Sequence, residues 1–407
     1  MRVLHVVKTS DGSQWAARQA KALFARGVEV HVILPSEQGR AIPDWVESGA
    51  HLHFADLRLP VGSPWELPRL LRNARTIVSQ ISPDIIHSHF VTTTCLIRMA
   101  LGPRHPVPRV YQVAGPLHLE HGLSRRFEIS LAGPPDIWVC SSRYVMDLYR
   151  KADVPEGKLF LSYYGWFEEN ETRDCGKRSL REIVGAEAND ILIGNANMMY
   201  APKYHLGQRV GIKCHEDVID ALSQVISHNP RILGVLVGGA WGGAVWYEER
   251  LKRRAWRQAS NRIRFTGFLP PEHARVLVGE FNLVTHVPIS ENCGGVIEPL
   301  NLGVPVIASE VGGIPEVIID GMTGRLVPAR DQKALVARIE DALSSMDAMI
   351  LMAKRGRQLV RRMFDVERTN AEIFRIYEHL LDGTKATLDP FDSRAVTSRL
   401  GEEAALQ

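Results

Sequence analysis

Short runs of apolar residues alternate with longer amphipathic segments along most of the chain. In the clearest example, residues 3–7 predict a buried strand, residues 14–26 a helix with one apolar face, and residues 28–34 a second strand. Gly27 stands between the helix and the second strand, where glycine adopts the left-handed conformation that ends a helix at little cost. This order of elements is typical of a parallel sheet covered by helices.

The same alternation continues in two series, which a polar stretch near residues 168–178 separates. Further strands are predicted at residues 85–87, 109–113, 137–140 and 159–163, and then at 191–194, 232–237, 263–265, 283–287 and 306–308. Further helices are predicted at residues 333–343 and 366–381. A chain of 407 residues exceeds the size at which one hydrophobic core stops growing. The sequence therefore predicts two doubly wound α/β domains, residues 1–170 and 171–360, and a disordered tail over residues 383–407, where no periodicity remains.

Charge, cysteine content and hydropathy argue against several classes of protein. The formal net charge of +3 is too small to indicate a nucleic-acid-binding protein. The five cysteines never form a Cys-x-x-Cys pair, so neither a disulfide framework nor a zinc site is expected. The first apolar run is too short for a signal peptide, and no run approaches the roughly 18 to 20 apolar residues of a membrane-spanning helix. We therefore expect a cytoplasmic protein.

The segment over residues 288–328 carries the most specific chemistry. Glu291 and Glu298 flank Gly294 and Gly295 just before a predicted helix. Adjacent glycines let backbone N–H groups and the start of a helix approach an anion closely. Carboxylates on either side can accept hydrogen bonds from sugar or ribose hydroxyls, so the segment suits a nucleotide-sugar. A capped helix with two solvated glutamates fits the spacing equally well.

The later part of this segment favours the nucleotide-sugar. Residues 303–309 read GVPVIAS and residues 312–316 read GGIPE. With the two glutamates they resemble the donor-site signature of family 4 glycosyltransferases. The resemblance implies the GT-B fold, in which two Rossmann-like domains face each other across a cleft and a C-terminal helix, here residues 361–382, crosses back to the first domain. It also implies transfer of a hexose-type sugar from a nucleotide-diphosphate sugar to an acceptor hydroxyl, with retention of configuration.

The resemblance assigns roles to the two glutamates. Glu298 is expected to hold the ribose hydroxyls, and Glu291 to face the donor sugar near its reacting carbon. The family pattern places seven residues between them, whereas here six intervene, so that strict alignment from Glu298 puts Ser290 in the position of the first glutamate. Either Glu291 or Ser290 occupies that position.

A basic pair is expected on the donor phosphates. The resemblance assigns Lys213 to this role, although Cys214 replaces the usual glycine after it and Asn197 stands where the family carries an arginine. Arg209 or Lys203, on an inserted segment, is expected to replace that arginine. Arg209 is favoured because a planar guanidinium contacts phosphate through two hydrogen bonds. A solvated basic loop is the alternative.

Three further residues complete the expected site. By resemblance, Gly12 lies in a glycine loop that faces the donor phosphate and the acceptor, and His118 contacts the donor sugar. Phe268 occupies a loop that commonly touches the nucleotide base. A structural role for His118 and core packing for Phe268 are the alternatives.

The sequence predicts no metal site. No Asp-x-Asp motif occurs in the chain, which agrees with a mechanism that needs no metal or other cofactor. His87 and His89 alternate on a predicted strand, but no carboxylate or cysteine stands nearby at ligand spacing, so both are expected to be ordinary strand residues.

Other functions and partners stay open at this point. A sugar-nucleotide epimerase, a phosphorylase and a non-catalytic nucleotide-sugar-binding scaffold are alternatives to the transferase. Arg69, Arg72 and Arg75 form a basic face within residues 67–78, which suits peripheral contact with anionic lipid at the inner membrane face and a lipid-linked acceptor. A solvated helix face is the alternative. On family frequency, the expected context is surface polysaccharide or glycoconjugate assembly.

Overall fold

A computed structural model describes residues 1–166, 178–204, 207–383 and 391–405. The chain divides into two compact units: unit 1 comprises Met1–Glu171 and Phe364–Phe391, and unit 2 comprises Thr172–Met363 and Asp392–Gln407. Residues 168–177 of the expected domain boundary lie outside the described residues. Among the described residues, no helix is both long and apolar enough to cross a membrane.

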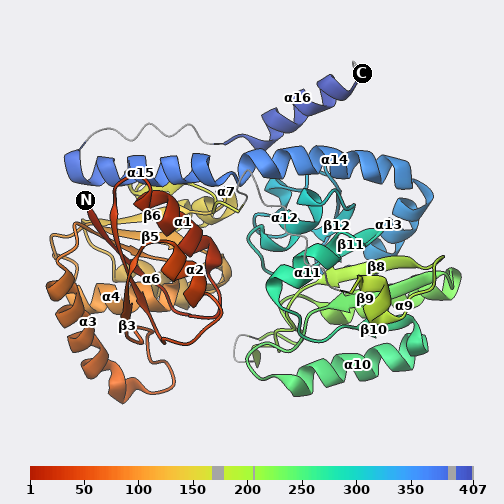
Figure 1. Cartoon of the computed structure of the whole chain (residues 1–407), viewed down its shortest axis with the longest axis horizontal. Coiled ribbons are helices and arrows are strands. Elements are labelled where there is room, and N and C mark those ends of the chain that lie inside the picture. Colours follow the sequence, from red (N-terminus) through yellow and green to blue (C-terminus); the bar gives the residue numbers. More distant parts are fainter. Residues whose placement is uncertain (167–177, 205–206, 384–390, 406–407) are drawn as a thin grey trace. The chain divides into compact units, whose positions relative to one another are not determined.

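Unit 1 is built on a seven-stranded parallel sheet in the order β3-β2-β1-β4-β5-β6-β7 (Figure 1). In chain order its strands are β1 (Arg2–Val6), β2 (Glu29–Leu34), β3 (His51–Phe54), β4 (Ile85–Ser88), β5 (Arg109–Val113), β6 (Asp136–Cys140) and β7 (Leu159–Leu161). Its helices are α1 (Gln14–Phe24), α2 (Ile42–Glu47), α3 (Leu67–Ile81), α4 (Val91–Leu101), α5 (Leu117–Glu120), α6 (Gly122–Ser130), α7 (Arg143–Arg150) and α15 (Val366–Asp382).

The two faces of the unit 1 sheet bury separate cores. Along β1, Val3 packs with α1, α2 and α15 on one face, whereas Leu4 packs with α3 and α4 on the other. This alternation follows from the two-residue period of a strand. Helix α15 joins the first face through Ile376 and Tyr377. The last long helix before the tail therefore belongs to unit 1.

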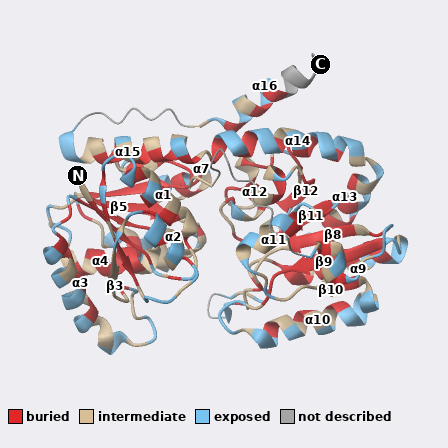
Figure 2. Cartoon of the chain, in the orientation of Figure 1, coloured by how far each residue is buried: buried red, intermediate tan, exposed pale blue. Residues whose placement is uncertain are grey.

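Unit 2 repeats the architecture with a six-stranded parallel sheet in the order β10-β9-β8-β11-β12-β13. Its strands are β8 (Ile191–Ala196), β9 (Ile232–Val237), β10 (Ile263–Phe265), β11 (Leu283–His286), β12 (Val306–Ser309) and β13 (Arg325–Val327). Its helices are α8 (Leu180–Val184), α9 (His215–His228), α10 (Val245–Ala259), α11 (Pro271–Val278), α12 (Gly294–Asn301), α13 (Gln332–Ser344), α14 (Met346–Met363) and α16 (Ser393–Ala405). In both units the central strands are buried between helices, as Figure 2 shows. The predicted pair of doubly wound α/β folds is confirmed.

The predicted disordered tail is wrong for residues 393–405, which form α16. This helix packs on α14 (Figure 1) and buries Ser393, Thr397 and Leu400. Their spacing places the three side chains on one helical face. The Thr397 hydroxyl donates to the Ser393 carbonyl at 2.7 Å, so burial leaves it satisfied. Two of the three buried side chains are hydroxyls, and the helix therefore shows no hydrophobic period in the sequence.

Candidate functional site

The order of the strands in unit 2 reverses direction beside β8. From β8 the chain proceeds outward through β9 to β10, and β11 then pairs with the other edge of β8. Ligands of open α/β sheets bind at such a switch point, outside the carboxyl ends of the strands. Five polar residues lie there, at the end of β11, at the start of α9 or on the loops that follow β8 and β11: Asn197, Lys213, His215, His286 and Glu291. We call them the polar cluster.

Direct contacts join four members of the polar cluster. Lys213 Nζ forms an ion pair and a hydrogen bond with Glu291 Oε2. His286 Nε2 lies 3.5 Å from the same carboxylate oxygen, and its Nδ1 lies 3.1 Å from the Asn197 amide nitrogen. The backbone N–H of Asn292 donates to Glu291 Oε1 at 3.2 Å. Glu291, rather than Ser290, therefore presents its side chain to Lys213.

The electrostatics of the polar cluster fix the charge states near neutral pH. Burial alone would raise the pKa of Glu291, but the Lys213 ammonium and the adjacent His286 ring outweigh it and hold this pKa well below its usual range. Burial, reinforced by Lys213, lowers the pKa of His215 to about 3 and also lowers the pKa of His286. The site thus combines a carboxylate with two neutral imidazoles.

Several buried polar atoms near the polar cluster have no hydrogen-bond partner among the described residues. They include both ring nitrogens of His215, both amide atoms of Asn195 at the end of β8, and the Ser290 hydroxyl. A buried polar group left unpaired costs about 1–3 kcal/mol. Such groups gathered at a switch point indicate a place for a polar ligand that hydrogen-bonds to them.

The two predicted glycines differ in what surrounds them. A Cβ atom on Gly295 would lie 2.1 Å from His286 Cε1, so any side chain there would displace the His286 ring. On Gly294 the nearest atom would be Glu291 Oε1 at 3.9 Å, which is ordinary contact. Gly295 therefore lets α12 begin directly against the polar cluster. Contact between these glycines and a donor phosphate stays a prediction.

Glu298 lies outside the polar cluster, on α12. Its Oε1 accepts a hydrogen bond from Arg275 Nε of α11 at 2.7 Å, and both side chains are partly exposed. Nothing in the sequence pointed to Arg275, because it pairs with a residue 23 positions away on a different helix. The expected role of Glu298 on the ribose stays a prediction.

Phe268 follows a close backbone approach between two loops. Gly238 and Gly267 form an isolated bridge, and a Cβ atom on Gly239 would lie 2.7 Å from the Phe268 nitrogen. The Phe268 side chain is 49% exposed. Core packing, the alternative explanation for this residue, is therefore wrong, and the ring has a face that a base could cover.

The basic residues of the inserted segment lie at the surface. Arg209 and Lys203 are both exposed, and neither has a side-chain hydrogen bond or ion pair to the polar cluster within the described part of the chain. Only Lys213, of the three predicted phosphate ligands, is brought to Glu291.

The two candidates in unit 1 have different surroundings. Gly12 lies in the turn after β1, where an added Cβ would meet only Thr9 at 3.9 Å. His118 lies on α5, and its Nε2 is 3.5 Å from the Tyr111 hydroxyl and 3.4 Å from the Tyr149 hydroxyl. Burial lowers the pKa of His118 to about 4, so its ring is neutral near pH 7.

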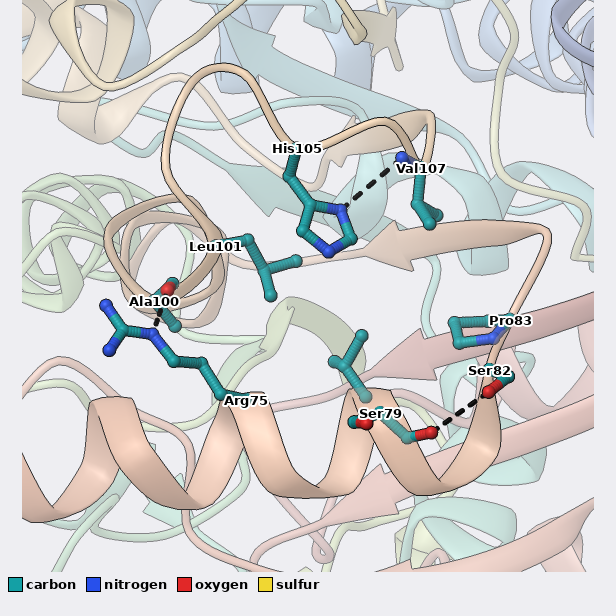
Figure 3. A pocket seen from close by; sticks show the side chains of 9 residues that line it. Arg75, Ser79, Ser82, Pro83, Ala100, Leu101, His105 and Val107 are labelled. Carbon is teal, nitrogen blue, oxygen red and sulfur yellow. Dashed lines mark hydrogen bonds between the residues drawn. The ribbon is translucent and has the colours of Figure 1, made fainter.

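A cavity of about 430 Å³ in unit 1 lies away from these residues (Figure 3). It opens between α3 and α4 and is lined in part by Arg75, Pro83, Leu101 and Val107. Pro83 precedes β4 and Val107 precedes β5, so the cavity is at the amino ends of these strands. Ligands of such sheets bind at the opposite ends.

Known families match both units. Residues 13–165 match the family described as Glycosyltransferase Family 4, and residues 204–359, which include Lys213, His286 and Glu291, match the family described as Glycosyl transferases group 1. The chain belongs to glycosyltransferase family 4.

Two curated relatives of this family 4 chain are D-inositol 3-phosphate glycosyltransferases. The protein of Corynebacterium diphtheriae is 30% identical over 129 residues, which cover 31% of this chain and 30% of the relative. The protein of Saccharomonospora viridis is 23% identical over 223 residues, which cover 53% of this chain and 49% of the relative. These matches span less than half of each relative.

Solved structures match over a longer stretch. HepE of Anabaena, solved in complex with UDP and glucose, has a TM-score of 0.76 and 19% identity, and the match covers 92% of this chain and 99% of HepE. At this identity the likeness establishes the fold alone. The predicted GT-B class is confirmed.

Proposed function

We propose that the protein transfers a sugar from a nucleotide-diphosphate sugar to the hydroxyl group of an acceptor. The polar cluster carries this proposal, because it places a carboxylate, an ammonium and neutral imidazoles at the switch point of unit 2. Beside them lie buried polar atoms that have no partner among the residues the structure describes. Membership of family 4 supports the reaction type. The complex of HepE with UDP and glucose supports this class of donor.

Lys213 and Glu291 act on neighbouring parts of the donor in this proposal. The ammonium of Lys213 and the N–H groups at the start of α12 neutralise the departing diphosphate, since the amino end of a helix favours negative charge. The Glu291 carboxylate accepts hydrogen bonds from sugar hydroxyls, and His286 orients it. Glu298 holds the ribose, Phe268 covers the base, and Gly12 leaves room for phosphate and acceptor.

The proposed reaction retains the anomeric configuration and uses no metal. The bond between the anomeric carbon and the phosphate oxygen breaks, and a bond from that carbon to the acceptor oxygen forms on the same face. The acceptor proton passes to the departing phosphate oxygen. His118, neutral and held by two tyrosine hydroxyls, positions the sugar. A hexose donor and a role in surface polysaccharide or glycoconjugate assembly belong to the same proposal.

Peripheral contact with a membrane is a further part of the proposal. Helix α3 buries Leu70, Ala74 and Val78 in the core and exposes Arg69 and Arg72 to solvent. An exposed basic face suits anionic lipid near a lipid-linked acceptor. Sedimentation with anionic vesicles at low salt tests it, and a protein that stays in the supernatant would contradict it.

Product analysis with labelled nucleotide-sugars tests the proposed reaction. We expect release of a nucleoside diphosphate that depends on an acceptor, and a drop of about 100-fold or more in Lys213→Gln and Glu291→Gln, since loss of one group that stabilises transition-state charge costs that much. Lys354→Gln, an exposed substitution on α14, is the control and should keep full activity.

Other products would identify the alternatives. Conversion of the sugar-nucleotide without an acceptor would indicate an epimerase, and dependence on inorganic phosphate would indicate a phosphorylase. Binding without turnover, whatever the acceptor offered, would indicate a scaffold. Full activity in both Lys213→Gln and Glu291→Gln would contradict the assignment of the site.

A further inference from the structure

Three buried histidines of unit 1 lie side by side at the switch point of its sheet. His5 of β1 pairs in register with His87 of β4, and His89 follows two residues later. Residues paired in register, and residues two apart on a strand, face the same side of a sheet. In the strand order, β1 and β4 are the neighbours between which the chain reverses direction. We call His5, His87 and His89 the histidine triad.

The rings of the histidine triad are close enough to share one ion. Their centroids are 4.4 to 5.2 Å apart. His5 Nδ1 and His89 Nε2 face each other at 2.9 Å, and one nitrogen from each of the three residues lies within 4.8 Å of the others. None of the three residues has any exposed surface.

Each ring of the histidine triad also carries an unpartnered nitrogen. His5 Nε2, His87 Nε2 and His89 Nδ1 are buried with no hydrogen-bond partner among the described residues. The Gln112 amide lies near His87 but lacks the geometry of a hydrogen bond. Burial lowers the pKa of all three histidines, that of His5 to about 3, so the rings are neutral. Neutral imidazole is the form that binds metals.

We propose that the histidine triad binds one late first-row transition-metal dication of the Zn²⁺ type. Imidazole nitrogens select such ions, whereas Mg²⁺ and Ca²⁺ require oxygen ligands, which the triad does not supply. The ion takes the place of the hydrogen bond between His5 Nδ1 and His89 Nε2, and His87 Nε2 is the one unpartnered nitrogen that it binds. Bonds of about 2.0–2.1 Å in a tetrahedral site require these atoms to separate to roughly 3.4 Å, a movement of about half an ångström.

The surroundings of His87 support the same assignment. The Tyr377 hydroxyl of α15 lies 2.5 Å from His87 Nδ1 and leaves Nε2 as the ligand atom. Ligating histidines usually hold their second nitrogen in a hydrogen bond of this kind, which fixes the ring. The bound ion thus ties β1 and β4 to α15 and stabilises unit 1. The triad shares no residue with the polar cluster, so this proposal does not rest on the proposed reaction.

A second group of three potential ligands in unit 1 offers a contrast. Glu29, His31 and His51 also lie within 4.8 Å of one another, but they are not buried. Glu29 pairs with Arg2 and His31, and His31 Nδ1 is bonded to His53. Because these three residues are exposed or partly exposed and solvent competes for their atoms, this group serves as the control.

Metal uptake by the full-length, untagged protein tests the proposal. After dialysis against a strong chelator, the protein is titrated with Zn²⁺ or Co²⁺, and bound metal, thermal unfolding and the Co²⁺ absorption spectrum are recorded. We expect one equivalent per chain, a rise of several degrees in unfolding temperature and a spectrum typical of nitrogen ligands. His5→Gln and His89→Gln should each abolish uptake, whereas His31→Gln should retain it.

Two outcomes would overturn the metal site. One is the absence of uptake by the wild-type protein at micromolar metal. The other is unchanged uptake in both His5→Gln and His89→Gln. If these variants fail to fold, X-ray absorption of the wild-type metal complex decides, because a shell of oxygen ligands alone would exclude the triad.

Discussion

Each unit of the molecule contains a group of paired opposite charges, and the two groups differ in exposure. In unit 1, Arg98 pairs with Glu128 and Asp136, and the exposed fractions of these side chains are 1%, 0% and 0%. In unit 2, Lys213 and Glu291 keep 16% and 15% of their side-chain surface exposed. We call Arg98, Glu128 and Asp136 the sealed group. We call Lys213 and Glu291 the open group, because solvent can reach them.

The hydrogen bonds around the two groups differ in the same sense. In the unit 1 group every carboxylate oxygen accepts a hydrogen bond: Glu128 from Trp138 at 2.9 Å and from Tyr149 at 3.0 Å, and Asp136 from Arg98 at 2.8 Å and from Arg109 at 2.5 Å. In unit 2 the Lys213–Glu291 pair has neighbours whose polar atoms have no hydrogen-bond partner in the described part of the chain. Within the unit 1 group only Arg98 Nη2 lacks a hydrogen-bond partner among the described residues. A sealed ion pair whose carboxylates are satisfied maintains the fold, whereas an open pair beside several unsatisfied atoms is suited to a polar ligand.

Breaking the sealed group should have the largest effect on stability. Arg98→Met leaves the buried Glu128 carboxylate without a cation, whereas Asp136 keeps its ion pair with Arg109. Removal of one partner of a buried pair costs about 3–5 kcal/mol. Denaturant unfolding measures this loss. A loss below about 1 kcal/mol would show that the group is not sealed as described.

A matched pair of glycine variants sharpens the description of the open group. Gly295→Ala places a methyl group against His286 and should destabilise unit 2 by about 1–3 kcal/mol through overpacking, while it also weakens donor binding. Gly294→Ala meets only ordinary contact and should change both quantities less. Equal effects of the two variants would contradict the close packing of α12 against the polar cluster.

The pH dependence of the free energy of unfolding tests buried histidines in both units, and the expected effect is smaller. Burial lowers the pKa of His5 and His215 to about 3 and that of His118 to about 4, from an ordinary value of 6.5. As the pH falls below 6.5, the unfolded chain therefore takes up these protons before the folded chain does. The free energy of unfolding that is present above pH 6.5 is lost as the pH falls toward 4. Each histidine contributes at most about 1.4 kcal/mol per pH unit.

Urea unfolding at pH 7.5, 6 and 5 checks this dependence. His118→Gln should reduce the slope, and His228→Gln, at an exposed position, should leave it unchanged. Glu291 adds nothing in this range, because its lowered pKa confines its contribution to pH values below its ordinary 4.5. A stability that stays constant from pH 7.5 to 5 would contradict the burial of the neutral histidines.

Central strands could be predicted from sequence far better than edge strands. The predicted ranges for the central strands β5 and β9 match the structure, because strands buried on both faces are rich in apolar residues. Of the four edge strands, β7 and β10 were also predicted. The edge strands β3 and β13 were missed. They are short and only partly buried, so their sequences, HLHF and RLV, carry little apolar pattern.

The candidate site shows the same limit of sequence reasoning. Lys213 and Glu291 could be assigned because they stand in or near a recognisable signature. His286, Arg275 and the partnership of His5 with His87 could not, because each depends on pairing between elements far apart in the sequence. Sheet register decides which strand-end side chains meet, and the local pattern does not contain that register.

The central claim, that the open group of unit 2 binds a nucleotide-diphosphate donor, is tested most directly by thermal unfolding with UDP, GDP, ADP, dTDP and CDP in the presence of EDTA. A ligand at 100 times its dissociation constant adds about 2.7 kcal/mol to stability, which shifts the unfolding temperature by a few degrees. We predict that one diphosphate stabilises the wild-type protein by this amount and that Lys213→Gln loses the shift. No shift with any diphosphate, or an undiminished shift in Lys213→Gln, would contradict the account.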